Sequence, residues 1–108
     1  MNWKDLTDKQ GLAEIINASE KITQAIFKHS TRCSISTMAK SRLERETAPK
    51  NVIFNYLDLI TYRNISNQIA ADFNVEHESP QILIIKNGKC IYNQSHNAIN
   101  MADIEELA

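Results

Sequence analysis

The sequence predicts an α/β domain in which helices flank a mixed central β-sheet. Apolar, strand-like runs alternate with amphipathic, helix-like runs through most of the chain, which is typical of parallel strands joined by crossover helices. A fully apolar run, an Asn-Gly pair and another strand-like run follow, and they predict an antiparallel hairpin at the end of the sheet. The chain has 108 residues, and we expect one domain over residues 1–108.

The N-terminal part of the chain is expected to form a strand, a helix and a second strand. Residues 3–6 are compatible with a short strand. Thr7 and Gln10 have the spacing of a capping box, which predicts a helix that begins there and continues to Ala18. The apolar run at positions 25–27 then predicts a buried strand over residues 21–29.

A second helix is predicted to begin at Cys33 and to be ended by Pro49. Apolar side chains recur along it at intervals of three and four residues, which is the pattern of a helix with one buried face. The side chains expected on that buried face are Ile35, Met38, Ala39 and Leu43.

The remaining elements follow from similar patterns. Residues 51–59 predict a third buried strand, and an apolar stripe after it predicts a helix that ends near Asn74. Residues 82–85 and 89–92 predict two strands joined by a type I′ turn at residues 87–88. Asn100, three residues before Asp103, is expected to cap a final helix.

Composition and charge argue against several classes of function. Lys and Arg total 12 and Asp and Glu total 13, with no basic cluster, so we expect no nucleic acid partner. No apolar run approaches about 18 residues, and the N-terminus is charged, so we expect no membrane span and no signal peptide. His29, His77 and His96 are too scattered for a zinc motif, and no metal is expected. Free thiols persist in the cytosol, so a cytoplasmic location is predicted.

Cys33 is the main candidate for chemistry because an apolar strand leads into it and a helix follows it. Free N–H groups and the positive end of the helix dipole stabilise a thiolate at such a position. Arg32 adds a neighbouring cation or is simply a solvated charge, and Ser34 adds an N–H group. Ser36 either donates its hydroxyl to the thiolate or satisfies backbone groups in the first turn, and the sequence leaves both roles open.

The chain has no Cys-X-X-Cys motif, because Ser36 stands where the second cysteine of that motif would be. The other cysteine, Cys90, lies in a different predicted strand and is assigned a structural role. Any redox chemistry is therefore expected to use one thiol. His29, at the end of its strand, is also assigned a structural role.

The predicted order of elements, with a cysteine after the second strand and a proline before the fourth, resembles the thioredoxin fold. The run His29-Ser30-Thr31-Arg32-Cys33-Ser34-Ile35-Ser36 resembles more closely the motif of monothiol bacilliredoxins of the YtxJ-like family. Ser34 departs from that motif, which commonly has proline there, and this difference is expected to change the tuning of the thiol. Ser79 and Pro80 fit the family's cis-proline site, where the residue before the proline offers backbone hydrogen bonds to a bound thiol.

This resemblance implies an enzyme that reverses protein bacillithiolation through Cys33 by a monothiol mechanism. Bacillithiol would be a co-substrate, no cofactor would stay bound, and the partners would be bacillithiolated cytosolic proteins. Two alternatives stay open at this point. One is a thioredoxin-fold module that binds a partner without catalysis, and the other is an iron–sulfur carrier like the monothiol glutaredoxins.

Overall fold

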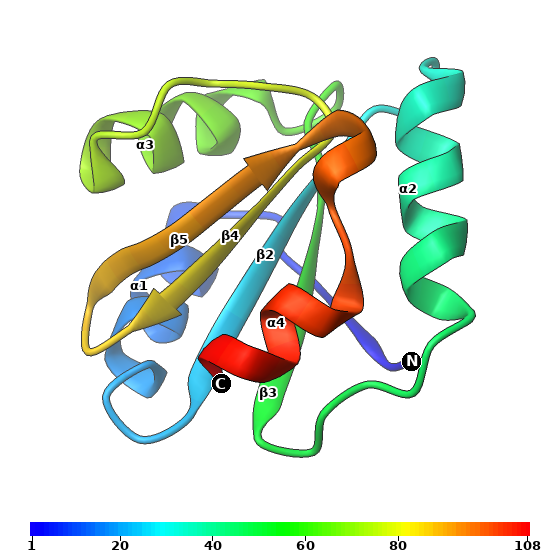
Figure 1. The fold of residues 1–108 in the computed structure, drawn as a ribbon. Helices are drawn as coiled ribbons and strands as arrows, with labels where there is room; N and C mark the ends of the chain where they lie inside the picture. The colour runs from blue at the N-terminus through cyan, green and yellow to red at the C-terminus, as the bar shows by residue number, and fades with distance from the viewer.

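The computed structural model describes all 108 residues as one five-stranded sheet with helices on both faces (Figure 1). The predicted alternation of strands and helices is confirmed, and a short 3₁₀ turn over His96–Ala98 is the only additional element. The strands are β1 (Trp3–Asp5), β2 (Thr23–His29), β3 (Val52–Asp58), β4 (Gln81–Lys86) and β5 (Lys89–Ser95). The helices are α1 (Lys9–Ala18), α2 (Ser34–Glu44), α3 (Arg63–Phe73) and α4 (Met101–Leu107).

The sheet is mixed, with the strand order β1-β3-β2-β4-β5. The first three strands in that order are parallel, and β4 runs antiparallel to both β2 and β5. Helices α2 and α4 cover one face and α1 and α3 cover the other (Figure 1). The central strand β2 is buried along its whole length, so its two sides contribute to two separate apolar clusters.

The hairpin and the last helix form as the sequence predicts. Asn87 and Gly88 both have positive φ, at 54° and 75°, as a type I′ turn requires. The Asn100 side chain accepts a hydrogen bond from the backbone N–H of Asp103 at 2.9 Å and caps α4. Helix α3 ends with Asn74 in the left-handed region. No helix is both long enough and apolar enough to cross a membrane.

The capping box predicted at Thr7 and Gln10 is wrong. Asp8 is the N-cap of α1, and its Oδ1 atom accepts the N–H of Gly11 at 2.7 Å. A side chain at Gly11 would crowd this cap, because a Cβ atom there would lie 3.2 Å from both Asp8 Oδ1 and the Leu6 side chain. A glycine costs stability inside a helix, but at position 11 its missing side chain leaves room for the cap.

The buried stripe predicted for α2 is also partly wrong. Ile35 and Met38 are 43% and 61% exposed, whereas Ser36, Ala39 and Leu43 are buried against the sheet. The helix is rotated so that its first turn presents a serine to the interior. It also ends at Glu44, well before Pro49, and a hydrogen bond from Glu46 N–H to Leu43 O tightens the turn that follows.

The cap observed on α1 predicts a difference between two adjacent substitutions. Asp8→Ala is expected to lower the free energy of unfolding by about 1 kcal/mol because it leaves the Gly11 N–H without its acceptor. Thr7→Ala should change it by less than about 0.5 kcal/mol. Urea unfolding of the two variants measures both changes. A larger loss of unfolding free energy for Thr7→Ala than for Asp8→Ala would contradict the assignment of Asp8 as the cap and support a cap at Thr7.

The rotation of α2 predicts a second difference. Met38→Ala should change the free energy of unfolding by less than about 0.5 kcal/mol, because the side chain is already in water. Leu43→Ala should lower it by about 2–5 kcal/mol, because it opens a cavity against the sheet. Equal losses in urea unfolding would mean that both side chains belong to the core.

Candidate functional site

Cys33 is the N-cap residue of α2, at the end of the loop that leaves β2. Its backbone is extended, with φ −112° and ψ 119°, its side chain is half-buried, and its sulfur forms no capping hydrogen bond. The backbone N–H groups of Ser34, Ile35 and Ser36 have no hydrogen-bond partner within the chain. The first turn of α2 therefore holds unpaired N–H donors next to the residue that carries the thiol.

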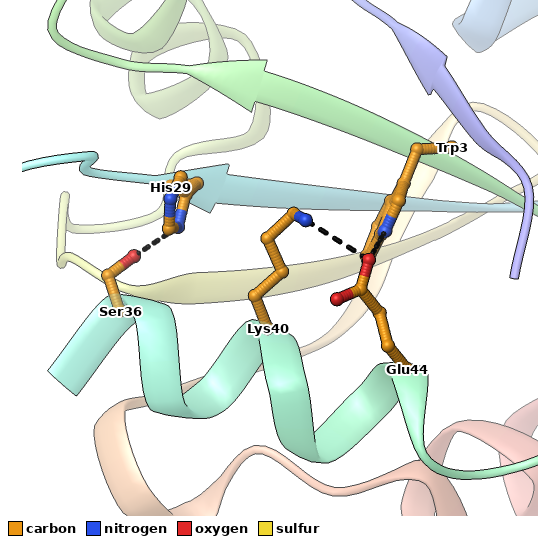
Figure 2. Close-up of polar contacts among 5 residues, drawn as sticks. All are labelled: Trp3, His29, Ser36, Lys40 and Glu44. Atoms are coloured by element: carbon orange, nitrogen blue, oxygen red, sulfur yellow. Dashed lines mark hydrogen bonds and ion pairs between the residues drawn. The ribbon is translucent and has the colours of Figure 1, made fainter. Parts of the chain in front are cut away.

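The side chain of Ser36 is fully buried and is engaged by two groups other than Cys33. Its Oγ atom accepts the backbone N–H of Ser30 at 3.0 Å. The same atom lies 2.7 Å from Nδ1 of His29 (Figure 2). No hydrogen bond joins Ser36 to Cys33, so of the two roles left open by the sequence the structure shows the first-turn role. The carbonyl of Ser30 in turn accepts the N–H of Cys33 at 3.2 Å.

Arg32 and Ser34, the two neighbours of Cys33, are exposed. Arg32 forms no salt bridge, so in this structure it is a solvated charge that follows the turn. Ser34 is the first residue of α2 and occupies the position where the family motif has proline. Its N–H is one of the three free donors, which a proline there would remove.

His29 ends β2 and turns its ring toward α2. The ring lies 5.9 Å from that of Phe27 and 5.5 Å from that of Tyr56, and the residue is only 6% exposed. Burial and the positive charge of Lys40 lower the pKa of His29, while Asp58, Glu44 and a hydrogen bond with the Ser36 backbone oppose this shift. The imidazole is therefore neutral at neutral pH.

Further along α2, Lys40 and Glu44 bind the helix to β1 (Figure 2). Glu44 accepts the indole N–H of Trp3 at 2.8 Å and pairs with Lys40 at 3.0 Å, and these contacts lower the pKa of Glu44. The Lys40 ammonium lies over the rings of Trp3 and Tyr56, 6.0 and 5.6 Å from their centroids. These contacts fix the orientation of the helix that carries Cys33 at its start.

The bond between Ser79 and Pro80 is cis, as the resemblance implies. Lys28 pairs with Gln81 across β2 and β4, and the same register one residue further brings Pro80 beside His29. The Pro80 loop and the Cys33 loop therefore lie at the same end of the strands. The carbonyl of Pro80 accepts the N–H of His96 at 3.1 Å, and Ser79 Oγ is buried without a hydrogen-bond partner.

On the opposite face of β2, Lys28 is a fully buried cation. Its Nζ atom donates to the carbonyl of Ser66 at 3.2 Å and lies 3.3 Å from Nδ1 of His77. Burial lowers the pKa of Lys28 from 10.5 to about 8. Burial, followed by the charges of Lys28 and Arg63, also lowers the pKa of His77, which suits a neutral ring that accepts from the ammonium.

Cys90 lies on β5 and is remote from Cys33. It pairs with Ile85, which pairs with Gln24 near the start of β2. Gln24 and His29 are therefore separated along β2 by about 16 Å at roughly 3.3 Å per residue. The Cys90 thiol donates to the carbonyl of Tyr92 at 3.3 Å, and burial raises its pKa.

Several residues of the site were not predicted from the sequence, among them Lys28, Lys40 and Trp3. A lysine inside an otherwise apolar central strand was a usable signal for Lys28, because a buried charge needs specific partners. Nothing in the spacing along α2 pointed to Lys40 or to its contact with Trp3. No group of three or more His, Cys, Asp or Glu side chains is placed to hold a metal ion.

Solved structures with the same fold include several thioredoxins. A thioredoxin-fold protein with a suggested oxidoreductase activity has a TM-score of 0.84 and 28% identity, over 96% of this chain and 91% of that one. Thioredoxin from Malassezia sympodialis has a TM-score of 0.75 and 14% identity, over 98% and 87%. Thioredoxin from Trypanosoma brucei brucei also has a TM-score of 0.75, with 16% identity over 97% and 86%.

The fold, with a cysteine at the start of α2 and a cis-proline at the same end of the sheet, is that of a thioredoxin-fold thiol–disulfide oxidoreductase. A family model described as monothiol bacilliredoxin BrxC matches residues 4–104. The chain belongs to this family, and the resemblance found in the motif around Cys33 is confirmed.

The buried lysine makes a prediction about stability and pH. Because the pKa of Lys28 is about 8 in the folded chain and 10.5 as its ordinary value, the unfolded chain binds more protons between these pH values. The penalty for burying the charge is thus complete below about pH 8 and declines as pH rises. The wild-type chain should gain on the order of 2 kcal/mol relative to Lys28→Met between about pH 7 and pH 10.

Urea unfolding at a series of pH values measures this difference. Lys50→Met, at an exposed lysine, is the matched control and should follow the wild type across the range. A pH-independent difference between wild type and Lys28→Met would show that Lys28 does not titrate with a lowered pKa.

Proposed function

We propose that this protein removes bacillithiol from bacillithiolated cytosolic proteins, with Cys33 as nucleophile and bacillithiol as co-substrate. Membership of the monothiol bacilliredoxin family supports the choice of substrate. The observation that carries the proposal is the start of α2, where a half-buried thiol stands as N-cap beside three free N–H donors. A thiolate is the group that such a position stabilises.

The reaction consists of two thiol–disulfide exchanges. In the first, the Cys33 thiolate attacks the bacillithiol sulfur of the mixed disulfide, that disulfide breaks, and the substrate cysteine leaves as a thiolate and takes up a proton. Cys33 is then joined to bacillithiol. In the second, the thiolate of another bacillithiol attacks the bacillithiol sulfur of this adduct, releasing bacillithiol disulfide and the Cys33 thiolate.

A monothiol mechanism agrees with the positions of the other candidate resolving groups. Position 36 holds a serine whose hydroxyl is bonded to Ser30 and His29. Cys90 lies toward the far end of the sheet, and a disulfide needs Cα atoms within about 7 Å. The adduct on Cys33 must therefore wait for an external thiol.

The loop that ends at Pro80 is the proposed binding surface for the part of the substrate chain that carries the thiol. It leaves the sheet beside His29, next to the turn that carries Cys33. The backbone of Ser79 would form hydrogen bonds to the bound chain, in the manner that the family resemblance implies.

The assignment of the nucleophile predicts opposite results for the two cysteine variants. Cys33→Ser should transfer no bacillithiol, because no other thiol stands at a helix start. Cys90→Ser should react within about twofold of the wild type, because its sulfur is held in β5 with a raised pKa. Intact-mass analysis after mixing reduced protein with a bacillithiolated substrate protein measures the adduct and the freed substrate thiol.

The wild-type adduct should persist until a thiol is added. Its spontaneous conversion to an internal disulfide would contradict the monothiol mechanism. The same substrate carrying glutathione in place of bacillithiol tests the choice of small thiol, and faster or equal removal of glutathione would contradict bacillithiol specificity.

A further inference from the structure

His29 does not itself contact the nucleophile, yet it ends the strand from which the Cys33 turn departs. Its ring packs beside those of Phe27 and Tyr56, which are partners across β2 and β3. Its Nδ1 atom lies 2.7 Å from Oγ of Ser36 (Figure 2). We infer that His29 is a positioning residue, whose Nδ1 atom accepts the Ser36 hydroxyl proton and thereby fixes the turn that presents Cys33. The hydrogen bonds of His29 are observed in the structure, but the effect of His29 on catalysis rests on the proposed function.

The directions of the hydrogen bonds follow from the number of protons. The backbone N–H of Ser30 can only donate, so Ser36 Oγ is the acceptor in their 3.0 Å contact. The single proton of the Ser36 hydroxyl is then free to point to His29 Nδ1. The chain of donors thus runs from Ser30 to Ser36 to His29, and the imidazole carries its own proton on Nε2.

The same chain reaches Cys33 through the backbone. The carbonyl of Ser30 accepts the N–H of Cys33 at 3.2 Å and closes a four-residue turn between them. One end of this turn is held by Ser36, and the other end is the N-cap of α2. A change in the acceptor at His29 therefore alters the position of the thiol relative to the free N–H groups of the first turn.

The arrangement requires a neutral imidazole, and its surroundings favour one. The charges of Lys40 and Glu44 on α2 and of Asp58 on β3 act on the ring, the Ser36 backbone forms a hydrogen bond with it, and Tyr56 of β3 packs against it. Burial and Lys40 dominate, and they lower the pKa of His29 below its ordinary value of 6.5. Once the ring is protonated, Nδ1 becomes a donor, and Ser36 Oγ receives two N–H groups while its own proton loses its acceptor.

Two substitutions at position 29 separate positioning from packing. His29→Phe keeps an aromatic ring against Phe27 but removes the acceptor. His29→Asn places an amide oxygen on the same Cγ atom that carries Nδ1, so it keeps an acceptor near Ser36 but cannot titrate. Ser36→Ala removes the other partner, and His96→Gln, at an exposed histidine, is the matched control.

The readout is the second-order rate of Cys33 with dipyridyl disulfide, which needs no bacillithiol and reacts at acid pH, in a Cys90→Ser background. At neutral pH we expect His29→Phe and Ser36→Ala each to lose roughly tenfold, because the thiol is displaced from the free N–H groups at the helix start. The double variant should lose little more than either single variant. His29→Asn should stay within about threefold of the background protein.

The ratio of rates for the background protein and His29→Asn cancels the titration of the thiol and the reagent. The ratio of the background rate to the His29→Asn rate should be constant above pH 6.5 and should fall below that pH as His29 takes up a proton. The ratio of the His96→Gln rate to the His29→Asn rate should fall in the same way. A rate for His29→Phe within twofold of the background, an equal loss in His29→Asn, or a ratio that stays flat over the whole pH range in which both proteins stay folded would each overturn the inference.

The result also separates this inference from the proposed function. If His29→Phe does not fold, as judged by urea unfolding, Ser36→Ala and the pH dependence of His29→Asn still decide the matter. If the dipyridyl disulfide rates follow the expected pattern but no bacillithiol is transferred from a substrate protein, the positioning role stands and the proposed substrate is wrong.

Discussion

Much of the site depends on one constraint, the alternation of side chains along the central strand β2. Lys28 and His29 are consecutive, so they point to opposite faces of the sheet, and both are buried. Buried polar groups must find partners, and each of these finds them in a different loop or helix. Lys28 reaches Ser66 and His77, and His29 reaches Ser36.

The end of one strand therefore holds the two segments that meet at the site. Lys28 contacts the segment before the cis-proline, while His29 contacts the helix that begins at Cys33. The antiparallel pairing of β2 with β4 makes this possible, because the end of one strand lies beside the start of the other. If β4 ran parallel to β2, the proline loop would lie at the opposite end of the strands.

The positions of the two cysteines bear on the chemistry of a monothiol protein. With Cys90 roughly 16 Å along the sheet from the end of β2, both exchange steps of the proposed reaction have an external partner. A site used in this way has to admit a protein and then a small thiol. The exposure of Arg32, Ser34 and Ile35 around the half-buried Cys33 agrees with that requirement.

The sequence by itself determined the order of strands and helices, the hairpin turn, the cap of α4 and the cysteine at the start of α2. These features depend on neighbours within a few residues, such as Asn87 with Gly88, whose preferences are local. Only the tertiary structure decided which face of α2 is buried, because Met38 and Ser36 both fit a periodic stripe. It also decided the partners of Lys28, His29 and Trp3, since each lies far along the chain or depends on the rotation of a helix against the sheet. Such contacts are set by how whole elements pack, and no short stretch of sequence specifies them.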